Sequence, residues 1–163
     1  MGGVSIAVPK PFRSRKVFFD VLEDRNLPSS YTVNTLSDAP WEIQDPKTGR
    51  VWLSLRAAIN YGNADPDSDA TVNFSVSGTI NLVNGQLPTL VGKTWEINGA
   101  GITVDGGGNS GIFAVNAPDA TINGICLQNA ANSAALSNWG TLTINGGQVL
   151  NSQAGGIINA QGA

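Results

Sequence analysis

The chain has 163 residues, a length typical of one domain, and only 13% of them are charged, with a formal net charge of −3. This mildly acidic balance argues against nucleic acid as a partner, since nucleic-acid-binding proteins present a basic face, and no apolar run reaches the length of a membrane span. The sequence lacks histidine, which removes Ser-His and Cys-His nucleophile pairs and His-ligated metals, and its single cysteine, Cys126, can form no internal disulfide.

Residues 1–30 are predicted to form an export or anchor-like segment that lies largely outside the fold. The segment is rich in charge, and three prolines interrupt any long element. Its apolar stretch at 17–19 ends at Asp20, well short of the core of a signal peptide. We therefore expect a tail with a short helical patch rather than a clean signal peptide.

Residues 31–36 predict the first strand, because polar and apolar residues alternate there and β-branched residues are frequent. The following segment, 37–51, contains two prolines and a Lys-Thr-Gly turn and is predicted to be a polar loop.

Residues 54–61 predict a helix. Ser54 is suited to the N-cap position and Gly62 to the helix stop. The spacing i, i+3, i+4 places three apolar side chains on one face, namely Leu55, Ala58 and Ile59.

The rest of the chain predicts short strands. After a turn-rich segment at 63–69, residues 71–76 alternate strictly and residues 79–83 follow a glycine. From there to the end, strand-like pieces are separated by glycine, asparagine and proline, and no helical period occurs.

The tripeptide Ile-Asn-Gly occurs three times, at 97–99, 122–124 and 144–146. Its steps of 25 and 22 residues are typical of a stacked repeat architecture. The dense leucine framework of leucine-rich repeats and the period of helical repeats are both missing. The pattern therefore predicts an all-β fold, a right-handed parallel β-helix with coils of about 22 residues and one N-terminal capping helix.

In such a solenoid, equivalent residues of successive coils lie about 4.8 Å apart. Side chains that occupy the same position in each coil therefore stack into a column. The 22-residue step predicts five further equivalent pairs: Thr121 with Thr143, Leu127 with Val149, Asn129 with Asn151, Leu136 with Ile158, and Gly140 with Gly162. We expect the isoleucines of the tripeptide to stack inside. We expect asparagines to lie at the bends, in the left-handed backbone conformation, and to form a hydrogen-bonded ladder.

Residues 31–163 are thus predicted to form one β-helix domain, with the helix covering its N-terminal end because solenoid ends need caps. Residues 155–163 begin a coil without a visible cap. We expect the domain to be incomplete at its C-terminus, or to associate end to end with another copy there.

Several segments resemble the start of large bacterial surface proteins built on right-handed parallel β-helices, which open with an S-L-R-E-A-I helix. They occur in the same order here: Y-T-V-N-T at 31–35, S-L-R-A-A-I at 54–59, D-A-T-V-N-F at 69–74 and G-T-I-N-L at 78–82. G-T-L-T-I at 140–144 and G-G-I-I-N at 155–159 look like the coil motifs of that family.

L-E-D-R-N-L-P at 22–28 is similar to an L-E-D-R or L-E-P-R segment near the N-terminus of such exported proteins. Ala57 stands where that family usually has glutamate. The resemblance implies export and an extracellular or cell-surface location, and it supplies no catalytic residues.

Some parallel β-helices are pectin-type lyases or glycoside hydrolases, which need acidic calcium ligands with a Lys or Arg base, or two matched carboxyl groups. The coil region from residue 97 onward offers only Asp105 and Asp119 and no basic residue. Both are predicted to belong to turns.

Three other features have a ligand-binding and a structural interpretation. Asp65, Asp67 and Asp69 have the alternation of a calcium loop, but Ala70 and Val76 stand where an EF-hand loop needs Gly and Glu, so a solvated turn is favoured. The four tryptophans could stack on sugars, but Trp95 and Trp139 lie in strand-like segments and are predicted to be core or ladder residues. Cys126, between two apolar residues, is predicted to be packed or half-buried.

The sequence therefore favours a non-catalytic, exported structural or adhesion protein, with polysaccharide or another cell-surface component as partner and no cofactor. The alternative functions are a polysaccharide-active enzyme of the pectate-lyase type and a carbohydrate-binding module.

Overall fold

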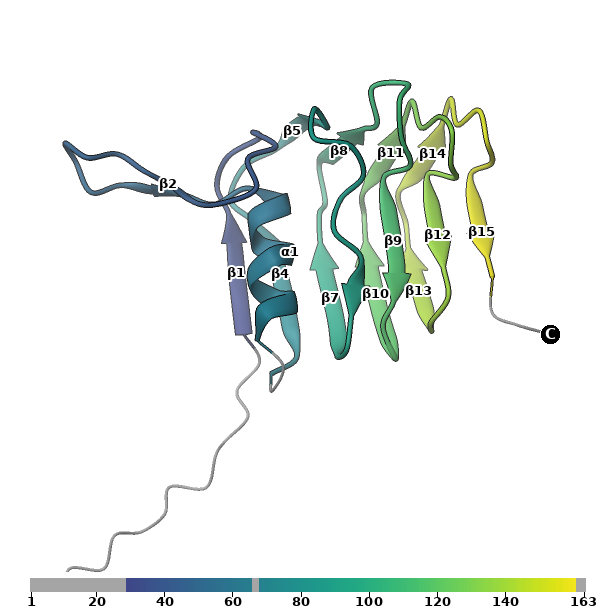
Figure 1. Ribbon diagram of the computed structural model, residues 1–163, viewed down its shortest axis with the longest axis horizontal. Helices are drawn as coiled ribbons and strands as arrows, with labels where there is room; N and C mark the ends of the chain where they lie inside the picture. The colour runs from purple at the N-terminus through teal and green to yellow at the C-terminus, as the bar shows by residue number, and fades with distance from the viewer. Residues whose placement is uncertain (1–28, 66–67, 161–163) are drawn as a thin grey trace, which may run out of the picture.

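The computed structural model describes residues 29–65 and 68–160, and in this part of the chain the predicted parallel β-helix is confirmed (Figure 1). Four coils of three strands follow one another. They comprise β4 (Ala70–Phe74), β5 (Gly78–Asn81) and β6 (Leu90–Val91); β7 (Thr94–Asn98), β8 (Ile102–Asp105) and β9 (Phe113–Asn116); β10 (Asp119–Asn123), β11 (Cys126–Gln128) and β12 (Leu136–Asn138); β13 (Leu142–Asn145), β14 (Gln148–Leu150) and β15 (Ile157–Asn159).

Stacking of the coils produces three parallel sheets. The first sheet has the order β1-β4-β7-β10-β13, where β1 (Ser29–Val33) precedes the coils. The second sheet has the order β5-β8-β11-β14, and the third has the order β6-β9-β12-β15. The predicted first strand is thus present, but it begins two residues earlier and ends three residues earlier than expected. Residues 1–28 of the predicted N-terminal segment lie outside the described residues.

The repeat tripeptides are in register, since Ile122 pairs with Ile97 on one side and with Ile144 on the other. The coil length is less uniform than predicted. Equivalent asparagines are 25 residues apart in the earlier coils and 22 apart between the third and fourth coils.

One predicted pairing in the last coil is wrong. Thr121 pairs with Thr143 and Leu127 with Val149, as expected, but Leu136 pairs with Ile157 rather than Ile158. The segment from Leu150 to Ile157 is one residue shorter than its counterpart in the previous coil, so the register shifts by one at this corner. Gly162, the predicted partner of Gly140, lies outside the described residues.

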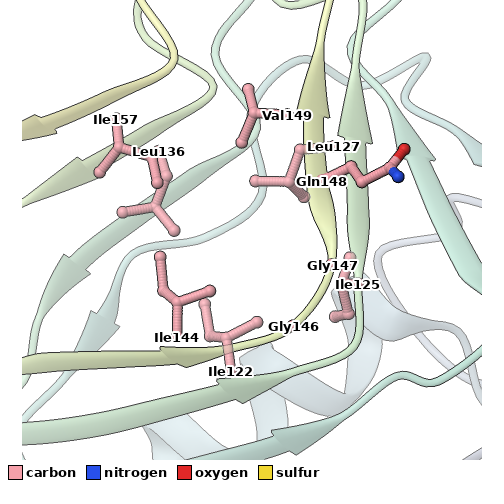
Figure 2. Close-up of a pocket in the computed structure, with 10 residues that line it drawn as sticks. All are labelled: Ile122, Ile125, Leu127, Leu136, Ile144, Gly146, Gly147, Gln148, Val149 and Ile157. Carbon is pink, nitrogen blue, oxygen red and sulfur yellow. The ribbon is translucent and has the colours of Figure 1, made fainter.

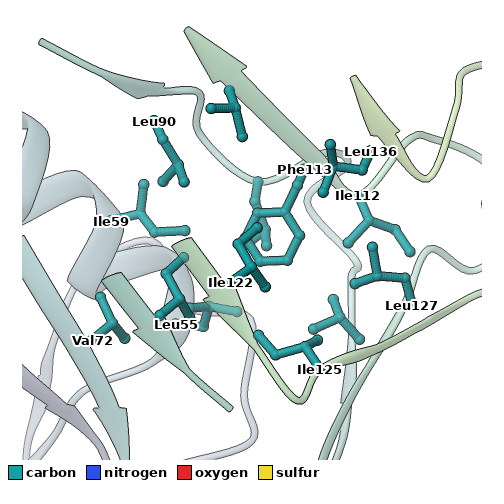
Figure 3. Packing of buried hydrophobic residues seen from close by; sticks show 14 of the residues in the cluster. Leu55, Ile59, Val72, Leu90, Ile112, Phe113, Ile122, Ile125, Leu127 and Leu136 are labelled. Carbon is teal, nitrogen blue, oxygen red and sulfur yellow. The ribbon is translucent and has the colours of Figure 1, made fainter. Parts of the chain in front are cut away.

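Successive side chains of each strand point alternately into and out of the solenoid. The inward-pointing side chains form a continuous column of apolar residues (Figure 3). Ile97 and Ile122 of the first sheet and Val104 and Leu127 of the second are almost fully buried. Phe113 of the third sheet belongs to the same cluster and is completely buried.

The helix α1 (Leu55–Ala64) covers the N-terminal end of this column, in contact with β1, β4 and β6. Its inner face carries Leu55, Ala58 and Ile59, all fully buried as predicted. The Ser54 hydroxyl accepts a hydrogen bond from the Ala57 amide at 3.0 Å, which confirms the N-cap.

Gly62 does not end the helix, contrary to the prediction, because α1 continues to Ala64. Gly62 is instead the point at which the helix backbone approaches the ring of Trp95. A Cβ atom at this position would lie 2.3 Å from Cη2 of Trp95, so only glycine fits.

The predicted loop at 37–51 contains a short antiparallel hairpin, β2 (Ile43–Gln44) and β3 (Val51–Trp52), which projects from the N-terminal end of the solenoid (Figure 1). Asp45 forms its turn by accepting hydrogen bonds from the Lys47 amide at 2.8 Å and the Thr48 hydroxyl at 2.6 Å. These contacts explain how a polar, proline-containing segment still pairs as strands.

Candidate functional site

The outer face of the first sheet carries an asparagine ladder that crosses four coils. Each side-chain amide nitrogen donates to the side-chain oxygen of the preceding coil, with distances of 2.9 Å from Asn145 to Asn123, 2.7 Å from Asn123 to Asn98 and 3.1 Å from Asn98 to Asn73. The predicted ladder is therefore confirmed. Its backbone conformation differs from the prediction, because these asparagines belong to extended strands, whereas Gly124 and Gly146 take the left-handed conformation.

A second, shorter ladder lies at the corner where the second sheet ends. Asn151 donates to Asn129 at 3.4 Å, and Asn129 donates to Asp105 at 2.7 Å. Asn129 and Asn151 have φ values of 55° and 51°, so here asparagine does adopt the predicted left-handed conformation at a bend.

Asp105 is the anionic end of this second ladder. Besides Asn129, its carboxylate accepts hydrogen bonds from Gln128 Nε2 at 2.7 Å and from the Gly107 amide at 2.8 Å. Burial raises the pKa of Asp105, but the hydrogen bonds from Gln128, Gly107 and Asn129 together hold the pKa below its ordinary value. Asp105, predicted to lie in a turn, is the last residue of β8, and the turn begins after it. Its carboxylate still contacts that turn through the hydrogen bond from the Gly107 amide.

Asp105 lies in an open polar groove of about 540 Å³, which we call the Asp105 groove. The groove is lined by Asn81, Asp105, Gly107, Gly108, Asn129, Asn151 and Gln153.

The catalytic alternatives needed a second carboxyl group or a base near Asp105, and the residues lining the groove include neither. Asp119, predicted to lie in a turn, is the first residue of β10, so the turn ends one residue earlier. Two basic residues lie next to or within the coils, Arg56 in α1 and Lys93 between β6 and β7, and both are buried.

Sequence reasoning missed the ion pair that Arg56 makes with Asp38. Arg56 Nε lies 2.7 Å from Asp38 Oδ1, and both side chains are almost fully buried. The guanidinium also donates to the carbonyl oxygens of Gly85 and Gln86. The sequence does show Arg56 as a charged residue within an apolar helical pattern, which indicates a buried partner. The partner, Asp38, could not be identified because its segment has no regular pattern.

The acidic turn proposed as a calcium loop is partly described. Asp65 accepts a hydrogen bond from the Ser29 hydroxyl at 2.7 Å, and Asp69 accepts one from the Thr94 amide at 3.1 Å. Residues 29–65 and 68–160 contain no group of three or more potential metal-ligating acids. Asp67 lies outside these residues, so the calcium site stays a prediction.

The tryptophans differ in exposure. Trp95 is buried in the core, as predicted, and its indole nitrogen donates to the Val91 carbonyl at 3.2 Å. Trp139 is 51% exposed and follows β12 at a corner, so of its two predicted positions, core or ladder, the core position is wrong. Trp41 is 66% exposed and precedes β2. Figure 1 shows β2 and β12 far apart, so these two rings do not form one aromatic row.

Cys126 is half-buried in β11, which confirms its predicted packing position.

At the other end of the solenoid, the apolar column is open (Figure 2). A hollow of about 210 Å³ is lined by side chains of the third and fourth coils: Ile122, Ile125, Leu127, Leu136, Ile144, Val149 and Ile157, with Gly146, Gly147 and Gln148 at its rim. Ile144 and Ile157 are 40% and 50% exposed, whereas their counterparts one coil earlier are buried. The outermost strands, β13, β14 and β15, each have one neighbour.

The helix of the described part of the chain is too short and too polar to cross a bilayer. Comparison of the chain with family models, with curated proteins and with solved structures gives no match.

Proposed function

We propose that the chain is a non-catalytic structural and adhesive β-helix of an exported cell-surface protein. The observation that carries this proposal is that the outer polar side chains hydrogen-bond to one another. In two sheets they form side-chain hydrogen bonds from coil to coil, and such bonds stabilise an extended scaffold.

The environment of Asp105 supports a structural role over a catalytic one. A general acid needs a raised pKa and a free proton, whereas the pKa of Asp105 is lowered and its oxygens accept three hydrogen bonds. A carbohydrate-binding module is the second candidate, favoured by the amide-rich lining of the Asp105 groove.

The resemblance of the 22–28, 31–35 and 54–59 segments to exported surface proteins supports the proposed location. Residues 1–28, which contain the first of these segments, lie outside the described residues, so the export role rests on sequence alone.

End-to-end self-association belongs to the same proposal. The open end combines exposed apolar side chains with unpaired strand edges, and both are typical of protein interfaces. The described residues of this end, 142–160, carry no charged side chain, so two copies would meet there without repulsion.

Two measurements test the function. Protease treatment of intact producing cells should cleave the protein, because we expect it at the surface. Purified protein incubated with a polysaccharide panel that includes pectins, with and without calcium, should yield no unsaturated or hydrolysed product. Retention inside the cell would overturn the location, and product formation would overturn the non-catalytic role.

A further inference from the structure

We propose that the Asp105 groove is a binding site for a neutral saccharide. This inference deepens the adhesive part of the proposed function, on which it rests, by naming the class of ligand. The groove lies at the corner where β8, β11 and β14 end, and amide or carboxylate side chains from four successive coils line it.

The polar groups of the groove are held in place before any ligand arrives. The Asp105 carboxylate is fixed by the three donors Gln128, Asn129 and Gly107, at 2.7 to 2.8 Å. Fixed carboxylate and amide planes bind neighbouring hydroxyl groups at low entropic cost, because no side chain has to be ordered on binding.

Two further side chains in the groove are free to bind. Asn81 and Gln153 are exposed, and neither side chain takes part in a hydrogen bond within residues 29–65 and 68–160. Each offers one acceptor and two donor hydrogens, which suits the mixed donor and acceptor character of a sugar hydroxyl.

Gly107 and Gly108 also line the groove and place no side chain in it. Both are exposed, with φ values of 64° and 70°, a conformation that favours glycine. A Cβ atom at Gly108 would meet nothing within 4 Å, so a sugar ring has room to approach the backbone there.

Charge selects a neutral ligand. Asp105 is the charged side chain of the groove, so anionic sugars such as uronates are repelled, and no Lys or Arg follows Lys93 in the sequence to offset that repulsion. A cation is disfavoured because amide N–H groups already point at the carboxylate oxygens. The lowered pKa of Asp105 keeps the carboxylate ionised at neutral pH.

The test is a calorimetric or NMR titration of the whole purified chain with neutral gluco-, manno- and xylo-oligosaccharides, and with uronate oligosaccharides with and without calcium. We expect binding of at least one neutral series and none of the uronates. Asn81→Ala and Gln153→Ala should each weaken that binding about twofold to tenfold, the loss expected for one hydrogen bond.

Asn116→Ala is the matched control, because Asn116 is also exposed, makes no side-chain hydrogen bond within the described residues and ends a strand at another corner. It should bind like the wild type. Absence of binding to all neutral series, preference for uronates, or equal binding by the groove variants and the control would each overturn the inference. None of these results would affect surface location or the lack of product, which test the proposed function separately.

Discussion

At the residue scale, the contact between Gly62 and Trp95 is the tightest point of the N-terminal end. Alanine stabilises a helix over glycine by up to about 1 kcal/mol, but here its methyl group would overlap the indole ring. We expect Gly62→Ala to lower the free energy of unfolding by about 1 to 3 kcal/mol, measured by urea denaturation.

A double-mutant cycle identifies the cause. In a Trp95→Phe background the ring is smaller, so Gly62→Ala should cost less than in the wild type. An equal cost in both backgrounds would show that the helix backbone, and not the indole ring, requires glycine.

The asparagine ladder predicts a contrast between two neighbours on β10. Asn123 both donates to Asn98 and accepts from Asn145, whereas Thr121, on the same outer face, makes no side-chain hydrogen bond within the described residues. Asn123→Ala should destabilise the protein by about 1 to 2 kcal/mol, and Thr121→Ala by less than about 0.5 kcal/mol. Similar losses for the two variants in thermal or urea unfolding would mean that the ladder contributes little.

At the element scale, the strands of the fourth coil form an interface if the open end binds a second copy. Replacing Ile157, which is 50% exposed at the rim of the hollow, by glutamate would place a charge there. We expect Ile157→Glu to weaken self-association at least about tenfold, measured by analytical ultracentrifugation over a range of concentrations.

Val83→Glu is the control for this experiment, since Val83 is 80% exposed and follows β5 in the first coil, away from the open end. It should associate like the wild type. A strictly monomeric wild-type protein would contradict the proposed end-to-end association.

The elements that follow a regular pattern could be predicted, and the others could not. The repeated Ile-Asn-Gly predicted the register of β7, β10 and β13 correctly. Its isoleucine occupies the same inward-facing position in each of these strands. The hairpin of β2 and β3 has no such pattern, and the turn at Asp45 depends on side-chain hydrogen bonds. The one-residue shift at β15 arises because the loop before β15 is one residue shorter than the loop before β12. The periodicity of the side chains carries no information about such a difference in loop length.

The candidate site was predictable to a similar extent. Asn129 and Asn151 were found by their spacing, and Asp105 by its glycine-rich turn. That Asn129 and Asp105 meet could not be read from the sequence, since the two residues are 24 positions apart and meet only because the intervening chain closes one coil.

At the scale of the whole molecule, carboxylates determine how stability depends on pH. The pKa values of Asp45 and Asp105 are below their ordinary value of 3.8 in the folded state. A lowered folded-state pKa gives stability that is complete above the ordinary value and is lost as the pH falls below it. Without histidine, no side chain of ordinary pKa titrates between about pH 5 and 8.

We therefore expect the free energy of unfolding to be nearly constant from about pH 8 to 5 and to fall below about pH 4, measured by urea denaturation at a series of pH values. Asp105→Asn should reduce the size of that fall, because the variant keeps an acceptor but has no proton to bind. A maximum near neutrality with a fall already at about pH 6 would contradict this assignment.

The direction of the two ladders also bears on synthesis. Each amide nitrogen donates to a coil that lies earlier in the chain, and α1 covers the end that is translated first. At about 5 to 20 residues per second, a ribosome takes roughly 1 to 5 s to deliver a coil, whereas strand pairing takes about microseconds. Each coil can therefore dock on a finished neighbour before the next emerges, so the protein can fold in the order in which it is translated.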